Sequence, residues 1–61
     1  MKKNYHIVIV TDEGFFKNEK FHEFTFKNVY RHEAFSLAEN EIVRLKKLYK
    51  NAYIGNVNEY A

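Results

Sequence analysis

The chain has 61 residues, a formal net charge of +2 and no cysteine. A chain of this length supports one hydrophobic core and hides only about 60% of the surface of its unfolded form, which excludes a second domain. Without cysteine, neither a disulfide nor a thiolate zinc site can reinforce the fold, and the composition fits a reducing compartment. The small net charge is far from the strongly basic balance of proteins that bind mainly by neutralising phosphates.

No apolar run approaches the ~20 residues needed to span a bilayer, and the run at residues 7–10 is too short for a signal peptide. We therefore expect a cytoplasmic protein with no membrane partner. The chain lacks proline and tryptophan but has seven asparagines, eight lysines and five tyrosines. This bias is typical of AT-rich coding sequence and points to a low-GC bacterium or its phage.

Two segments in the first half predict strands. Residues 5–11 form a β-branched run that is apolar on both faces, which is typical of a central strand. Residues 12–14 supply turn chemistry. Residues 21–27 alternate, with Phe24 and Phe26 on one face, as expected of a half-buried strand. Residues 15–20 form either a long hairpin loop or an extension of both strands.

The second half predicts a helix and a third strand. Apolar residues recur with the helical period over residues 33–50, with acids early and bases late, which complements the helix dipole. Residues 53–57 then read as a short strand. Its inward face is ambiguous because Ile54 and Val57 are three residues apart, and a bulge near Gly55 would reconcile them.

These elements predict one small α+β domain over residues 1–61 with ββαβ order. The expected sheet is three-stranded and antiparallel or mixed, in the order 2-1-3, with the helix on one face. The opposite face then lacks a second layer. If Tyr5, Ile7 and Ile9 face the helix, Val8 and Val10 lie on the uncovered face. Either these valines simply tolerate exposure, or the face docks a partner or forms a homodimer.

Three further residues are candidates for contact with a protein partner. Phe15 and Phe16 are adjacent aromatics beside Gly14 in or near the turn. They either anchor an interface at an exposed loop tip or fold back to close the open end of the core. Glu41 lies at the edge of the apolar stripe of the helix. It either pairs with Arg44 one turn later or a strand lysine, or fixes register against a partner.

A second candidate site would bind nucleic acid through the basic side chains of the helix. The alternative is an ordinary solvated helix face. In the nucleic-acid site, the basic side chains would bind phosphates while exposed aromatic rings stack on nucleobases. The helix bases are Arg44, Lys46, Lys47 and Lys50, with Lys2, Lys3, Lys17 and Lys20 as additions.

The sequence contains few residues in patterns typical of catalytic or metal sites. There is no glycine-rich phosphate loop and no serine or cysteine nucleophile in a recognisable context, since Ser36 falls on the solvent side of the helix. His6 and His22 could approach across the hairpin, but histidines at such positions are usually polar surface. We expect no enzyme activity, no metal and no cofactor.

The order strand, strand, helix, strand and the motif Glu-Ala-Phe-Ser-Leu-Ala-Glu at residues 33–39 resemble small phage-encoded inhibitor proteins. These include the RNA-polymerase inhibitor of some lytic podophages and some anti-CRISPR proteins, which bind a host protein stoichiometrically. Asn56, Asn58 and Glu59 stand where that inhibitor has basic residues, so no binding residue is carried over. The helix start also resembles HicB-type antitoxins, whose glycine and proline signals are missing here.

The sequence therefore predicts a non-enzymatic protein-binding module, encoded by a phage or mobile element. Its expected partner is a host protein that it inhibits or modulates, and the module itself is a possible homodimer. The alternatives are a nucleic-acid-binding domain and a self-assembling structural protein.

Overall fold

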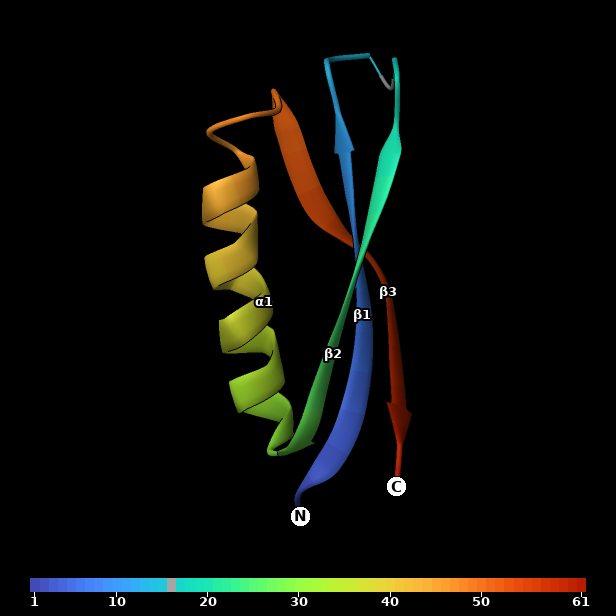
Figure 1. The fold of residues 1–61 in the computed structure, drawn as a ribbon, viewed down its shortest axis with the longest axis vertical. Helices are drawn as coiled ribbons and strands as arrows, with labels where there is room; N and C mark the ends of the chain where they lie inside the picture. The colour runs from blue at the N-terminus through green and yellow to red at the C-terminus, as the bar shows by residue number, and fades with distance from the viewer. Residues whose placement is uncertain (16) are drawn as a thin grey trace.

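The computed structural model describes residues 1–15 and 17–61 as three strands and one helix. The elements are β1 (Lys3–Asp12), β2 (Lys20–Val29), α1 (Arg31–Leu45) and β3 (Asn51–Tyr60). The strands form one antiparallel sheet in the order β2-β1-β3, and α1 lies along one face of it (Figure 1). The expected α+β fold with ββαβ order and the first strand at the centre is confirmed.

The helix starts and ends earlier than its apolar period predicts. At the start, the Glu33 carboxylate accepts the backbone N–H of Tyr30 at 2.9 Å, so an acid three residues into the helix satisfies a backbone donor just before it. At the end, the carbonyl of Leu45 accepts from the N–H groups of both Leu48 and Tyr49 at 2.9 and 2.8 Å. This tightening into short-range bonds ends the helix, and residues 46–50 turn toward β3.

The hydrophobic core lies between α1 and the inner face of the sheet. Tyr5, Ile7 and Ile9 alternate along β1 toward the helix and are fully or almost fully buried. They pack with Ala34 and Ala38, the two helix residues that are completely buried. Because alanine has a small side chain, the helix backbone can lie close to the sheet. The predicted inner face of β1 is confirmed.

A bulge in β3 brings its two apolar residues to the inner face. Ile54 pairs with Ile9 and Val57 with Ile7, and the register between β1 and β3 shifts at this point. Gly55 is the extra residue on β3. Because the shift restores the alternation, Ile54 and Val57 both pack against the core, and the expected bulge is confirmed.

Glycine is required at the bulge because a neighbour fills the space of its side chain. A Cβ on residue 55 would lie 2.6 Å from Cγ2 of Val10. We expect Gly55→Ala to lower the free energy of unfolding by about 1–3 kcal/mol, because the β-branched Val10 has few rotamers with which to retreat. Urea unfolding checks this. Val10→Ala should restore part of the loss in the double variant, and additive effects of the two substitutions would contradict the contact.

Candidate protein-binding face

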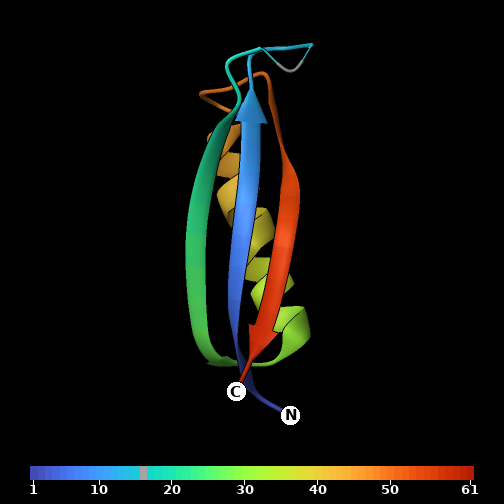
Figure 2. The same ribbon diagram turned by 90° about the vertical axis from the view of Figure 1, so that its right-hand side faces the viewer.

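The face of the sheet opposite α1 is uncovered. Figure 2 looks onto it, with α1 behind the sheet, and no other element of the described residues lies in front of the strands. Alternation along the strands assigns the side chains of this open face. They include His6, Val8, Val10, Phe21, Glu23, Thr25, Lys27, Tyr53, Asn56 and Asn58. This set is called the open face below.

The open face has a somewhat smaller share of charged residues than the whole chain. Two of these ten residues, Glu23 and Lys27, are charged, compared with 30% of the whole chain. Glu23 is also bonded to Nε2 of His6 at 2.9 Å. A lower share of charged residues together with exposed aromatic rings is a feature that protein interfaces share.

Aromatic residues flank β1 near one end of the open face. Val10 pairs across the sheet with Phe21 on β2 and Tyr53 on β3. Val10 is 6% exposed, whereas Phe21 is 66% and Tyr53 39% exposed. The expectation that the Val10 side chain is exposed to water or a partner is therefore wrong. This side chain fills the space above Gly55 and has a large residue on each side. Val8 is half-buried.

Phe21 is the residue that sequence reasoning missed. The alternation of residues 21–27 places Phe21 on the same side as Glu23, Thr25 and Lys27, opposite the core phenylalanines. The alternation therefore predicts an outward Phe21. Its aromatic character alone does not separate it from the buried Phe24 and Phe26 that follow. Tyr53 could not be placed from sequence alone, since its face depends on the bulge at Gly55.

The other predicted contact residues lie away from the open face. Phe15 lies in the loop between β1 and β2, is 93% exposed and has φ 54°. The expectation that it folds back to close the core is therefore wrong for Phe15, while Phe16 lies outside the described residues. Glu41 is half-buried on α1 and pairs with Arg44 at 3.1 Å, as expected. The predicted contact residues thus occupy three separate places.

The lysines after the helix meet those of the hairpin at one end of the molecule. Figure 1 shows the loop between β1 and β2 beside the turn that joins α1 to β3. Cδ of Lys50 is 3.5 Å from the position that a Cβ on Gly14 would take, and Nζ of Lys20 is 5.6 Å from the ring centroid of Tyr49. This end, called the lysine end, comprises Lys17, Lys20, Lys46, Lys47 and Lys50.

A buried carboxylate holds the lysine end together. Asp12 is 1% exposed, and its Oδ1 accepts the backbone N–H of Gly14 at 2.9 Å and Nδ2 of Asn51 at 2.7 Å. The hairpin loop is thereby tied to the first residue of β3. The Tyr53 hydroxyl adds a contact of 3.3 Å with Oε2 of Glu19. Burial first, then this carboxylate, raises the pKa of Tyr53.

The histidines that could have formed a metal site lie on opposite faces of the sheet. His6 contacts Glu23 on the open face, whereas His22 faces the core side, bonded to Thr11 Oγ1 at 2.8 Å. Their predicted approach across the hairpin is therefore wrong. Within residues 1–15 and 17–61, no three His, Asp or Glu side chains are grouped to hold a metal ion. No helix in this same part of the chain is long and apolar enough to cross a membrane.

A small hollow of about 270 Å³ is present at the start of α1. Its lining consists of exposed residues from this one helix: His32, Glu33, Ser36 and Leu37. An activated serine nucleophile needs a hydrogen bond to its base. The hydrogen bonds found among the described residues include none between Ser36 and His32.

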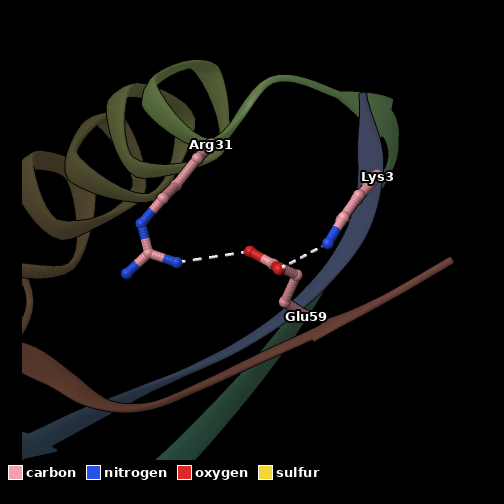
Figure 3. Close-up of polar contacts among 3 residues, drawn as sticks. All are labelled: Lys3, Arg31 and Glu59. Carbon is pink, nitrogen blue, oxygen red and sulfur yellow. Dashed lines mark hydrogen bonds and ion pairs between the residues drawn. The ribbon is translucent and has the colours of Figure 1, made fainter. Parts of the chain in front are cut away.

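A carboxylate clamp joins three elements at the end opposite the lysine end. Figure 3 shows Glu59 of β3 between Lys3 of β1 and Arg31 of α1. Its carboxylate oxygens lie 2.9 Å from Nζ of Lys3 and 3.3 Å from Nη1 of Arg31. The hydrogen bond from Lys3 first, then one from the Tyr5 hydroxyl, lowers the pKa of Glu59 below its ordinary value of 4.5.

The clamp predicts a pH dependence of stability. Because the pKa of Glu59 is lower in the folded than in the unfolded chain, its contribution is complete above about pH 5.5 and is lost as the pH falls through the native pKa. Glu59→Gln should therefore lose less stability than the wild-type chain between about pH 6 and pH 3 in urea unfolding. Glu39→Gln, at an exposed helix position, is the control. Parallel pH profiles for wild type and Glu59→Gln would contradict the clamp.

Comparison with known proteins identifies no relative of this chain. Neither a protein-family model, nor a curated protein, nor a solved structure matches the chain.

Proposed function

We propose that the protein is a non-enzymatic protein-binding module that acts through the open face. The observation that carries this proposal is the combination of a sheet face without a covering layer and the exposed rings of Phe21 and Tyr53 on it. A domain normally packs two layers around its core, and covering the exposed rings of Phe21 and Tyr53 with a partner removes apolar surface from water.

The resemblance to phage-encoded inhibitors supplies the wider proposal. On that basis the chain comes from a phage or mobile element and works in the bacterial cytoplasm. Stoichiometric binding then inhibits or modulates the protein that it contacts. Binding of this kind needs no catalytic group, and the open face contains none of the nucleophile and base arrangements that catalysis requires.

Phe21 provides a sharp test of the open face, because α1 offers a matched control. Val43 is 60% exposed on the helix, close to the 66% of Phe21, but far from the open face. We expect Phe21→Lys to weaken capture of a stoichiometric protein by about thirtyfold or more, the cost of losing an aromatic anchor and burying a charge. Val43→Lys should capture as the wild type does.

The measurement is affinity capture with the tagged chain, from a bacterial lysate that also contains an untagged copy. Quantitative mass spectrometry then reports every protein bound near one-to-one, the untagged chain included. Circular dichroism verifies that both variants are folded. If the wild-type chain retains no protein stoichiometrically, or if Phe21→Lys and Val43→Lys retain it equally, the proposal fails.

A second candidate function is nucleic-acid binding at the lysine end. The observation that supports it is that the hairpin holding Lys17 and Lys20 lies beside the turn that holds the three lysines after α1. The segments 12–20 and 46–50 hold five lysines against three acidic residues, which equals the net charge of +2 of the whole chain. Phe15, exposed in the same loop, offers a ring on which a base can stack.

This second function predicts a salt-dependent affinity for single-stranded oligonucleotides. Each phosphate neutralised contributes about −0.7 to the slope of log affinity against log salt. Lys46→Gln with Lys47→Gln should therefore make the slope shallower by about 1.4, as measured by fluorescence anisotropy. Lys2→Gln, near the opposite end, is the control. Absence of binding at low salt would remove this function and leave the open-face proposal intact.

A further inference from the structure

Strand β2 is a long free edge of the sheet. It pairs with β1 on one side, and Figure 2 shows no described element along its other side. Such an edge presents unpaired backbone N–H and C=O groups, which natural monomers protect with proline, bulges or charges. β2 has no proline, and its irregularity at Asn28, with φ 57°, lies near its end. Its charged residues therefore decide which strand can pair with it.

The sequence of β2 is complementary to itself in the antiparallel direction. Residues 23–27 read Glu-Phe-Thr-Phe-Lys, which is symmetric around Thr25 except that its two ends carry opposite charges. When two copies pair antiparallel about Thr25, Glu23 of each copy lies opposite Lys27 of the other. Phe24 then lies opposite Phe26, and Thr25 meets itself. Pairs of these three kinds stabilise neighbouring strands, and sliding one strand by two residues in either direction removes both charge pairs.

The charged side chains of this segment are accessible for such pairs. The side chain of Glu23 is 69% exposed, although its Oε1 lies 2.9 Å from Nε2 of His6. Lys27 is also exposed, and it takes part in none of the ion pairs found within residues 1–15 and 17–61. A second copy supplies both opposite charges in one register, so charge complementarity selects it as the strand that pairs with β2.

The helix covers the inner side of β2 incompletely. Figure 2 shows α1 crossing the sheet diagonally: Arg31 at its start is held by β3, and the turn after its end packs Tyr49 on His22 of β2, with ring centroids 5.5 Å apart. Phe24 and Phe26, on the inner side of β2, are only partly buried. Antiparallel pairing of two β2 strands would place a second pair of rings beside them and remove apolar surface from water.

We propose that two copies of this chain pair through β2 about a two-fold axis at Thr25. The dimer has one continuous antiparallel sheet in the order β3-β1-β2-β2-β1-β3. Both helices lie on one side of it, and both open faces lie next to each other on the other side. This inference goes beyond the proposed function, because it uses the edge of the sheet and leaves the open faces accessible to a different protein.

The test is sedimentation equilibrium of the purified chain from about 10 µM to about 1 mM, because an interface along one strand edge is small and its association weak. We expect the wild-type mass to rise from that of the monomer toward twice that value. Glu23→Lys and Lys27→Glu should each weaken self-association by about tenfold or more, since each places two pairs of like charge across the axis. Glu39→Lys, the same charge reversal at an exposed position of α1, is the control and should not change it.

Mixing the two single variants guards against loss of folding. The Glu23→Lys chain has lysine at both positions and the Lys27→Glu chain has glutamate at both, so an equimolar mixture should form the dimer that neither variant forms alone. The double variant Glu23→Lys/Lys27→Glu should dimerise as the wild type does.

Three results would overturn the inference: a wild-type chain that stays monomeric at about 1 mM, a dimer that neither single variant weakens, or a mixture that does not associate. In the lysate experiment, retention of the untagged copy that depends on Glu23 and Lys27 reports this dimer. Retention of another protein that depends on Phe21 reports the open face, so each proposal can fail without the other.

Discussion

A sheet of three strands has two faces, and the one helix of the described residues covers only one of them. This constraint follows from chain length, since three strands of ten residues and a helix of 15 leave little chain beyond the turns. The inner face is packed as a core, with Tyr5, Ile7 and Ile9 against two alanines. The outer face has no such layer, and the functional proposals for this protein derive from that asymmetry.

The open face is neither an ordinary solvated surface nor a second core. A solvated face seldom exposes large aromatic rings, whereas a core would bury Phe21 and Tyr53. The observed mixture places a buried valine between two exposed rings, with asparagine and threonine around them. Rings that are partly exposed lose little conformational entropy when a partner covers them, because they have few rotamers. The composition therefore suits an interface that forms after the chain has folded.

Polar contacts hold the two ends of the elongated molecule. Asp12 ties the hairpin loop to β3 at the lysine end, and Glu59 ties β3 to β1 and α1 at the other. Neither set of contacts reaches the open face. Every buried side-chain nitrogen or oxygen of the described residues has a hydrogen-bond partner, so these groups do not require a ligand to satisfy them. The polar groups at the two ends therefore have a structural role, whereas the exposed rings of the open face have none within the described residues.

The sequence by itself determined the element order, the central position of the first strand, its inner face and the need for a bulge near Gly55. These features follow from local periodicity, which the backbone imposes whatever the neighbours are. Only the tertiary structure decided the exposure of Val10 and Phe21, the separation of His6 from His22, and the gathering of lysines from two segments. Such features depend on register, strand twist and turn geometry, which bring together residues that are distant in the chain and carry no local signal.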